Sequence, residues 1–335
     1  MTLTMNLGVD SYDIVVERGA LSKAGEYLNL DRRVLVVTDS GVPKEYSEKA
    51  SSFCKDAVVY TFPQGEESKN FDTFKSLLSC LVENGFTRSD CVLSVGGGVC
   101  SDMAGFAAAT YMRGIDFYSI PTTLLSQIDA SIGGKTAIDF CGYKNIVGAF
   151  KQPKKVIIDP DVLQTLDKRQ IANGMSEAVK MSLTSDKELI TMFENGEYRT
   201  NLDEVIVRSL KIKKYVVEQD EKETGLRKIL NFGHTVAHAI ESNMNLAGLY
   251  HGECVGLGML CMCSENVRER LYKVMKDIGL PTEFDFDVKK ITEAVKHDKK
   301  MSGDNITVIY VNEPGTFEMK TVAFSEFENQ LSEVL

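Results

Sequence analysis

The sequence lacks any apolar run near the roughly 18 residues that a membrane-spanning helix requires. Residues 1–5 also lack the basic and apolar character of a secretory signal segment. Proline is scarce, at seven residues among 335, and no low-complexity segment interrupts the chain, so the chain can bury large cores. We therefore expect a globular, cytoplasmic protein with about two domains.

Basic residues are fewer than acidic ones: 38 Lys and Arg stand against 48 Asp and Glu, which gives a net charge of −10. This balance disfavours nucleic acid and anionic membrane as the main partner. A small anionic ligand would instead need Lys and Arg side chains gathered at one place.

Paired cysteines are also lacking, because the eight cysteines are scattered singly along the chain. Only Cys261 and Cys263 lie close together, and their spacing is wrong for a zinc knuckle. We expect most of the cysteines to be small buried apolar residues.

Histidine is the rarest titratable residue, and three of the four histidines, His234, His238 and His251, gather in one short stretch. His234, His238 and Glu241 are spaced i, i+4 and i+7, so one face of a helix would carry them all. A turn at residues 245–248 would lead into a second helix beginning near His251, which could then approach His234. Two imidazoles on facing helices lack one further ligand for a catalytic divalent metal. The alternative is that they are ordinary polar residues of two helices.

A carboxylate for this site occurs at Glu177, in an apolar stretch that predicts a helix over residues 174–181. Lys180 follows at i+3, so an exposed salt bridge between the two is the alternative interpretation. The apolar neighbours Met175, Val179 and Met181 argue against full exposure.

The first half of the chain alternates apolar strand patterns, at residues 12–16, 33–38, 57–62 and 91–95, with helical patterns near 43–55 and 71–85. This rhythm predicts a parallel sheet with crossover helices. Gly96, Gly97 and Gly98 follow one strand directly and precede a helix rich in small residues, an arrangement that lets backbone N–H groups approach a phosphate. The triplet is neither the usual dinucleotide fingerprint nor a Walker loop, and an ordinary tight turn is the alternative.

Residues 121–145 combine turn-forming residues with charged and amide side chains. Arg113, Lys135 and Lys144 each follow a segment that resembles a strand, on the side where open α/β sheets bind ligands, so an anion cradle is one interpretation and solvent-facing loops are the other. After residues 156–160 the helical pattern takes over. We therefore place the domains at residues 1–159 and 160–335.

In combination these motifs resemble the 3-dehydroquinate synthases, members of the sugar-phosphate cyclase family. The motifs are residues 96–99 with Asp102, 111–114, 121–139, 144–145, Glu177 with Lys180, 230–241 and 251–253. The resemblance extends from about residue 34 to residue 300. It implies an N-terminal Rossmann-like α/β domain that binds NAD, an all-helical C-terminal domain that binds Zn²⁺ or Co²⁺, a site in the cleft, and a homodimer.

The resemblance also assigns residues. The metal ligands would be Glu177, His234 and His251. NAD would contact Asp39, Glu66, Glu67, Ser68, Lys69, Gly96, Gly97, Gly98, Val99, Asp102, Thr122, Thr123, Lys144, Val162, Leu163, Gln164 and Thr165. Substrate would contact Arg113, Asp129, Lys135, Asn145, Lys180, Lys213, Arg227, Asn231, Lys299 and Lys300. Catalysis would rest on Lys180, Glu223, His238, Lys135, Asn145 and Arg227, with Glu223 and His238 at positions of proton transfer.

The activity that the resemblance implies is conversion of 3-deoxy-D-arabino-heptulosonate 7-phosphate to 3-dehydroquinate and phosphate, a step of the shikimate pathway. The reaction would pass through transient oxidation by NAD, phosphate elimination, reduction, ring opening and aldol closure. Three alternatives remain at this point: another sugar-phosphate cyclase, a metal-dependent alcohol dehydrogenase that releases NADH, and a protein on the same fold that binds nucleotide without catalysis.

Overall fold

The computed structural model of the chain describes residues 1–243, 248–283, 287–296, 301–302 and 304–334. The chain divides into two compact units, Met1–Leu166 and Asp167–Leu335. Pro160, where strand patterns give way to helical ones, begins the short helix η6 (Pro160–Thr165) at the end of the first unit. Within the described residues, no helix has the length and apolarity needed to cross a membrane.

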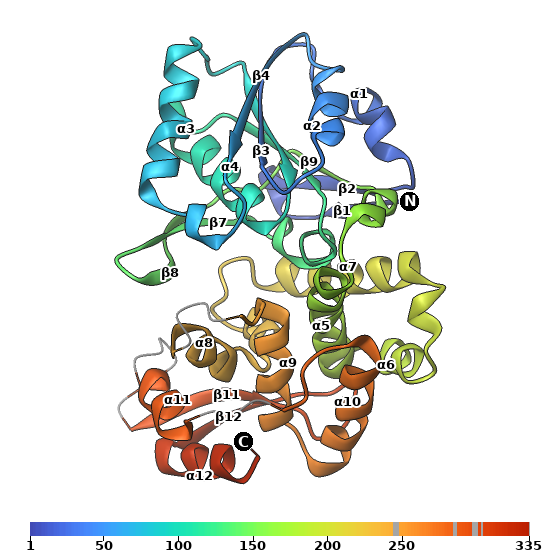
Figure 1. Cartoon of the computed structure of the whole chain (residues 1–335), viewed down its shortest axis with the longest axis vertical. Helices are drawn as coiled ribbons and strands as arrows, with labels where there is room; N and C mark the ends of the chain where they lie inside the picture. The colour runs from blue at the N-terminus through green and yellow to red at the C-terminus, as the bar shows by residue number, and fades with distance from the viewer. Residues whose placement is uncertain (244–247, 284–286, 297–300, 303, 335) are drawn as a thin grey trace. The chain divides into compact units, whose positions relative to one another are not determined.

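A seven-stranded sheet lies at the centre of the first unit, in the order β1-β2-β9-β6-β5-β3-β4 (Figure 1). Its strands are β1 (Thr2–Met5), β2 (Tyr12–Val16), β3 (Arg33–Asp39), β4 (Asp56–Phe62), β5 (Cys91–Gly96), β6 (Asp116–Pro121) and β9 (Lys155–Ile158). Neighbouring strands are parallel except β1 and β2. The four predicted strands and the parallel sheet are confirmed.

Strand β3 shows why the sheet is buried on both faces. Leu35 and Val37 belong to one apolar core with α3 (Phe71–Glu83) and α4 (Gly98–Thr110). Val34 and Val36 belong to another core, with α1 (Ala24–Tyr27) and α2 (Lys44–Ser51). Figure 1 shows these helix pairs on opposite sides of the sheet. A strand buried on both faces reads as a continuous apolar run, which is the pattern of residues 33–38.

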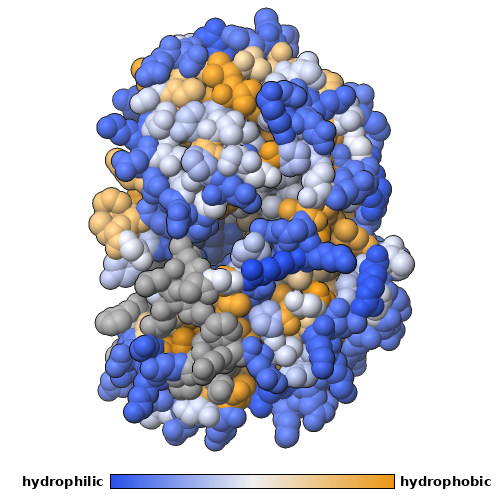
Figure 2. All heavy atoms as spheres, in the orientation of Figure 1, coloured by the Kyte–Doolittle hydropathy of each residue, from blue (hydrophilic) through white to orange (hydrophobic). Residues whose placement is uncertain are grey.

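Strands β7 (Lys135–Phe140) and β8 (Tyr143–Phe150) form a separate two-stranded hairpin that packs against α4. A methyl group added at Gly148 would lie 2.2 Å from the carbonyl oxygen of Thr136, so only glycine allows this close pairing. Phe140 and Tyr143 stand at the hairpin tip and are largely exposed. Figure 2 shows hydrophobic side chains where Figure 1 places this tip, on an otherwise mainly hydrophilic face.

The second unit is mainly helical. Its helices are α5 (Lys168–Ser185), α6 (Lys187–Glu194), α7 (Leu202–Gln219), α8 (His234–Asn243), α9 (His251–Cys261), α10 (Glu265–Ile278), α11 (Val288–Val295) and α12 (Phe324–Val334). Helix α5 is buried on all sides over residues 172–184, and α9 over residues 252–261. The two helices touch closely, because a methyl group added at Gly252 would lie 2.1 Å from the carbonyl oxygen of Asn173. Part of the turn expected at residues 245–248 lies outside the described residues.

The helical character of the second unit is confirmed, but the expectation that it is all helical needs correction. Strands β10 (Met301–Ser302), β11 (Asn305–Tyr310) and β12 (Glu318–Ala323) form a small antiparallel sheet. Ile306 and Val308 of β11 are buried and alternate with less buried residues. This period of two over residues 305–308 is the strand signal in the sequence.

Candidate functional site

Glu177, His234 and His251 meet in the second unit, as the sequence predicted. Glu177 comes from the buried middle of α5, whereas the two histidines are the first residues of α8 and α9. Their possible ligand atoms all lie within 4.8 Å of one another. The Nε2 atoms of His234 and His251 lie 3.7 and 3.6 Å from Oε1 of Glu177. Two imidazole nitrogens and one carboxylate oxygen form a donor set that suits Zn²⁺ or Co²⁺.

The other nitrogen of each ring has a partner that orients it. Nδ1 of His251 lies 2.8 Å from Oε1 of Glu241, and Nδ1 of His234 lies 3.2 Å from the carbonyl oxygen of Phe232. If each Nδ1 carries the proton and donates it, each Nε2 presents a lone pair toward Glu177. The sequence placed Glu241 on the histidine face at i+7 but gave it no role, although that spacing was the available signal.

Two charged side chains at this cluster, those of Lys180 and Glu177, are buried. The ammonium of Lys180 contacts Oε2 of Glu177, and both side chains are almost wholly buried. Burial lowers the pKa of His251, but hydrogen bonds to Glu177 and Glu241 outweigh it and raise the pKa to about 10. A divalent cation would compete with that proton, because a metal ligand must be the neutral imidazole.

His238 lies one turn beyond His234 and is exposed. Its ring centroid lies 5.5 Å from that of His234 and 6.5 Å from that of His251. It does not belong to the group of converging ligand atoms found among the described residues. His238 is therefore a neighbour of the ligand set and is exposed to solvent.

Further buried cations belong to the same unit. Lys213 of α7 and Arg227 of η8 (Leu226–Asn231) are both buried, and η8 packs against α5 and α7. The guanidinium of Arg227 donates to the carbonyl oxygen of Glu221 at 2.6 Å. Asn231 donates to Oε1 of Glu223 at 2.6 Å. Arg227 and Asn231 both lie in this 3-10 helix, and the side chain of Arg227 is buried in the unit.

A single carboxylate holds the loop that leads into η8. Asp220 accepts hydrogen bonds from the backbone N–H groups of Thr224, Gly225 and Arg227 and from the hydroxyl of Thr224. Burial raises the pKa of Asp220, but these hydrogen bonds outweigh it and lower the pKa to about 2. Glu223 within this loop has a left-handed backbone with φ of 61°. The sequence did not predict this role for Asp220.

In the first unit, the expected nucleotide residues gather at the carboxyl ends of three adjacent strands. Asp39 ends β3, Gly96 ends β5, and Thr122 follows β6 with its N–H bonded to the carbonyl oxygen of Gly96 at 2.9 Å. A methyl group at Gly96 would lie 3.6 Å from Oδ2 of Asp39, so the two residues are close. Gly97 is the residue before α4, whose N-terminus offers unpaired N–H groups to an anion.

Lys69 connects residues that the resemblance assigned to different ligands. Its buried ammonium lies 2.5 Å from Oδ2 of Asp102 and 2.5 Å from Oδ1 of Asn145. Burial lowers the pKa of Lys69, but the carboxylates of Asp102 and Glu66 outweigh it and raise the pKa. The network joins η3 (Glu66–Ser68), α4 and the β7–β8 hairpin.

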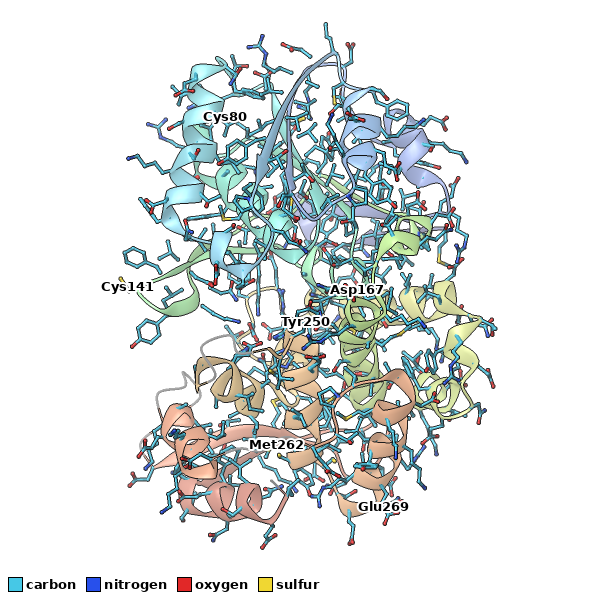
Figure 3. All side chains as sticks on the ribbon, in the orientation of Figure 1. Cys80, Cys141, Asp167, Tyr250, Met262 and Glu269 are labelled. Atoms are coloured by element: carbon cyan, nitrogen blue, oxygen red, sulfur yellow. The ribbon has the colours of Figure 1, made fainter. Side chains whose placement is uncertain are left out.

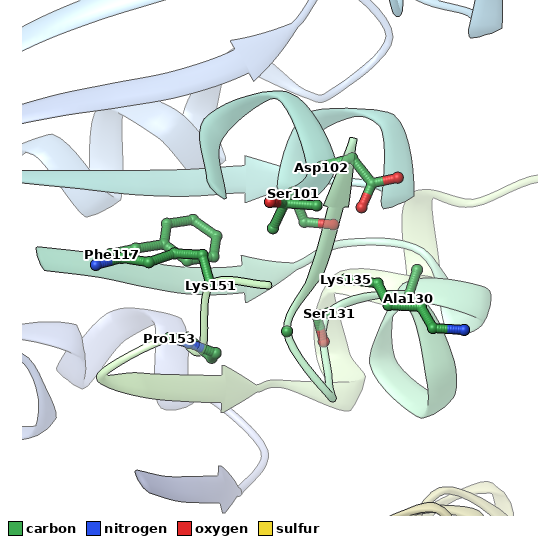
Figure 4. A pocket seen from close by; sticks show the side chains of 10 residues that line it. Ser101, Asp102, Phe117, Ala130, Ser131, Lys135, Lys151 and Pro153 are labelled. Atoms are coloured by element: carbon green, nitrogen blue, oxygen red, sulfur yellow. The ribbon is translucent and has the colours of Figure 1, made fainter. Parts of the chain in front are cut away.

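Beside this network is a small pocket (Figure 4). It is lined by Ser101, Asp102, Phe117, Ala130, Ser131, Gly134, Lys135, Thr136, Lys151 and Pro153. Asp129 lies next to Ala130 in the π-helix η5 (Ser126–Ala130). The remaining expected NAD residues, Val162 to Thr165, lie in η6, where the hydroxyl of Tyr46 donates to the carbonyl oxygen of Val162 at 3.2 Å.

The expected placement of Arg113 after a strand is wrong. Arg113 ends η4 (Tyr111–Arg113), which follows helix α4 and leads into β6, so it lies near the amino end of that strand. Met112 and Arg113 both have left-handed backbones, with φ of 49° and 70°, where the chain leaves the helix. Lys135 and Lys144 belong to the hairpin instead of the main sheet. Lys299 and Lys300 lie outside the described residues.

The cysteine expectation is confirmed, because five of the eight cysteines are buried. Cys141 is exposed on the turn between β7 and β8. Burial raises the pKa of both Cys261 and Cys263 to about 12. These two thiols are therefore protonated at neutral pH and are poor metal ligands.

Comparison with known proteins gives one consistent family. The sequence model for the N-terminal region of 3-dehydroquinate synthase matches residues 59–173, and the one for the C-terminal region matches residues 174–301. The 3-dehydroquinate synthase of Streptococcus mutans is 38% identical over 353 aligned positions, which cover 99% of each chain. That of Streptococcus thermophilus is 37% identical with the same coverage.

Solved structures agree on the fold. The 2-epi-5-epi-valiolone synthase from Streptomyces hygroscopicus, with NAD⁺ and Zn²⁺ bound, is 27% identical, with a TM-score of 0.87 over 96% of each chain. A 2-deoxy-scyllo-inosose synthase complexed with carbaglucose-6-phosphate, NAD⁺ and Co²⁺ is 24% identical, with a TM-score of 0.87 over the whole of both chains, and shows the fold alone. From the two family matches and the full-length relatives, the chain belongs to the 3-dehydroquinate synthase family.

Proposed function

We propose that this protein is a cytoplasmic lyase that converts 3-deoxy-D-arabino-heptulosonate 7-phosphate to 3-dehydroquinate and phosphate. In this role it serves the shikimate pathway, which leads to chorismate and the aromatic amino acids. The observation that carries the proposal is the convergence of Glu177, His234 and His251 within 4.8 Å in a chain that matches the family over its full length.

The residues present fit both cofactors of the proposal. Glu177, His234 and His251 would hold a divalent metal, and the ends of β3, β5 and β6 with the start of α4 would hold NAD. When bound, the metal supplies Lewis acidity at a substrate hydroxyl, and NAD supplies a hydride acceptor that ends the cycle unchanged. The valiolone synthase, at 27% identity, supports the pairing of NAD⁺ with Zn²⁺ on this fold.

The protein's own cations would bind the substrate's carboxylate and phosphate. Lys180, Lys213 and Arg227 are all at least 95% buried, although the whole chain carries a net charge of −10. Lys and Arg bind carboxylate and phosphate groups through charge-assisted hydrogen bonds, so three buried cations in one unit suit an anionic ligand. Asn231 in the second unit, and Arg113, Asp129, Lys135 and Asn145 in the first, complete the proposed substrate contacts among the described residues.

Proton transfer is assigned to residues that adjoin the ligand set without belonging to it. His238 is exposed one turn beyond His234 and would hold or release a proton at a substrate hydroxyl. Glu223 is oriented by the amide of Asn231 at 2.6 Å and would be the second proton-transfer group. With proton transfer at these two residues, the ligand nitrogens of His234 and His251 are left for the metal.

A homodimer is also part of the proposal. The β7–β8 hairpin exposes Phe140, Tyr143, Ile146 and Phe150, and a second copy of the chain would remove such apolar surface from water. Light scattering should give about twice the 37.1 kDa mass of the chain. A mass of one chain at micromolar concentration would contradict the dimer.

The decisive experiment incubates the protein with 3-deoxy-D-arabino-heptulosonate 7-phosphate, Co²⁺ and a substoichiometric amount of NAD. We expect one phosphate for each substrate consumed, 3-dehydroquinate as the carbocyclic product by NMR, and no net NADH. NADH that accumulates until the NAD is used up, after which product formation stops, would indicate a dehydrogenase. A different carbocycle would indicate a sister cyclase, and binding of NAD without turnover would indicate a non-catalytic protein.

A further inference from the structure

Three residues of α5, each one turn after the last, contact the first three residues of α9. Arg169 pairs with Glu253, Asn173 pairs with Gly252, and Glu177 faces His251. The spacing i, i+4 and i+8 places Arg169, Asn173 and Glu177 along one stripe of α5. The contact between the proposed metal ligands Glu177 and His251 is therefore the last of three successive contacts between the two helices.

The ion pair between Arg169 and Glu253 is bidentate. Its Nε and one terminal nitrogen lie 2.6 and 2.7 Å from the two carboxylate oxygens of Glu253, a side chain that is only 6% exposed. The same guanidinium stacks over the ring of Tyr250 at 4.2 Å and donates to the carbonyl oxygen of Gly248. Arg169 thus binds both the segment just before His251 and the helical turn just after it.

One N–H group at the start of α9 depends on α5 for its hydrogen bond. The N–H groups in the first turn of a helix have no partner within the helix. The N–H of Gly252 donates to Oδ1 of Asn173 in α5 at 2.6 Å, whereas the N–H of Tyr250 donates to Oε2 of Glu253 in α9 itself at 2.7 Å, and Arg169 of α5 holds that carboxylate. Asp167 and Tyr250, the residues just before α5 and α9, are labelled in Figure 3. His251, as the first residue of α9, is therefore placed by side chains of α5.

We propose that Arg169 and Asn173 are positioning residues for His251: they fix the start of α9 on α5 so that the imidazole meets Glu177 at metal-binding distance. The inference rests on the proposed metal site. Metal sites require their ligands within about 0.5 Å of the productive geometry, a precision that a frayed helix end would not keep. Loss of the contacts of Arg169 should therefore lower metal affinity more than it lowers the stability of the fold.

The test compares two conservative variants of two-pronged pairs in the same unit. Arg169→Lys keeps the charge but loses the fork, and Arg270→Lys does the same to the pair of Arg270 with Glu194, at 2.5 and 2.9 Å, between α10 and α6. For each metal-free protein, the Co²⁺ dissociation constant is measured by chelator competition, together with the visible spectrum of the Co²⁺ form and the thermal midpoint.

We expect Arg169→Lys to bind Co²⁺ at least tenfold more weakly, with an altered Co²⁺ spectrum, and Arg270→Lys to stay within twofold of the parent with an unchanged spectrum. Parental affinity and spectrum in Arg169→Lys, or an equal loss in Arg270→Lys, would overturn the inference while leaving the metal site intact. A parent chain that fails to bind Co²⁺ would overturn the metal site itself, and the inference with it.

A second variant covers the case in which Arg169→Lys does not fold. Glu253→Gln keeps the shape of the side chain and one acceptor oxygen but removes the charge that Arg169 meets. We expect at least threefold weaker Co²⁺ binding with the helical circular dichroism of the parent. Unchanged affinity in a folded Glu253→Gln protein would count against the positioning role.

Discussion

Oε1 of Glu241 lies 2.8 Å from Nδ1 of His251 and so determines which nitrogen of that ring faces Glu177. A carboxylate behind a metal-bound histidine fixes its tautomer and raises its basicity, and loss of such a partner typically costs about 10- to 100-fold in metal affinity. We predict that loss for Glu241→Ala, measured by chelator competition with Zn²⁺ or Co²⁺. Glu241→Gln should lose less, because the amide oxygen still accepts from Nδ1. Parental affinity in Glu241→Ala would mean that the contact is incidental.

Two neighbouring histidines should respond differently to the same substitution. His251→Ala removes a proposed ligand, so metal content and activity should both be lost while the circular dichroism spectrum is kept. His238→Ala should keep the metal but lower kcat by about 10²- to 10⁴-fold, as loss of a general acid or base does. Metal analysis beside kinetics separates the two roles. Loss of metal in His238→Ala would show that it acts as a ligand.

The sequence predicted the ligand set because its signals were local. His234 and His251 each begin a helical pattern on either side of a short turn, and Glu177 stands out as a carboxylate in an apolar helix. The contacts that support these ligands were not predictable in the same way. Arg169 and Glu253 are 84 residues apart in the chain, and only the packing of α5 on α9 brings them together.

The fold shows the same division. Strands β3 and β5 read as continuous apolar runs and were predicted. Strand β6 is also buried but is not such a run, and β1, β11 and β12 are short or half exposed; none of these was predicted. The wrong placement of Arg113 after a strand has a local cause. The end of α4 is followed by two residues with left-handed backbones, and neither residue is of a type that predicts a turn. Met112 and Arg113 are not glycines, and sequence alone gives little reason to expect a positive φ there.

Asp220 gives a prediction for acid stability. Hydrogen bonds from Gly225, Thr224 and Arg227 lower its folded-state pKa to about 2 from an ordinary value of 3.8, against the effect of burial. A lowered pKa means that the ionised form stabilises the fold above the ordinary value, and that this contribution is lost as pH falls toward 2. Asp220→Asn should therefore lower the thermal midpoint clearly at pH 6, and the difference from the parent should shrink below about pH 4.

The measurement for Asp220 is a series of thermal melts of parent and variant between pH 2 and pH 6. Asp186, whose pKa is also lowered, offers a control away from η8, because Arg208 holds its carboxylate at 2.8 Å. For both Asp186→Asn and Asp220→Asn, the difference in thermal midpoint from the parent should shrink at low pH. Only Asp220→Asn should also lower turnover, since its loop carries Glu223. A pH-independent difference for Asp220→Asn would contradict the assignment.

Arg227 allows the sharpest test of the substrate site. Its guanidinium is 2% exposed and uses one terminal nitrogen to bind the carbonyl oxygen of Glu221 at 2.6 Å. We propose that the planar guanidinium also binds a substrate anion, so Arg227→Lys should lose a charge-assisted hydrogen bond worth on the order of 1 to 3 kcal/mol. At about 1.4 kcal/mol per decade, kcat/KM should fall by at least about tenfold.

A lysine ammonium can replace the hydrogen bond to the carbonyl oxygen of Glu221, so the thermal midpoint and metal content of Arg227→Lys should stay near those of the parent. Substrate kinetics, metal analysis and a thermal melt on the same preparation check all three. If kcat/KM stays at the parental level while the midpoint falls, Arg227 only supports η8, and the anion must be bound by Lys180 or Lys213 instead. If kcat/KM falls alone, the buried fork is a substrate contact, because a purely structural arginine would lower stability as well.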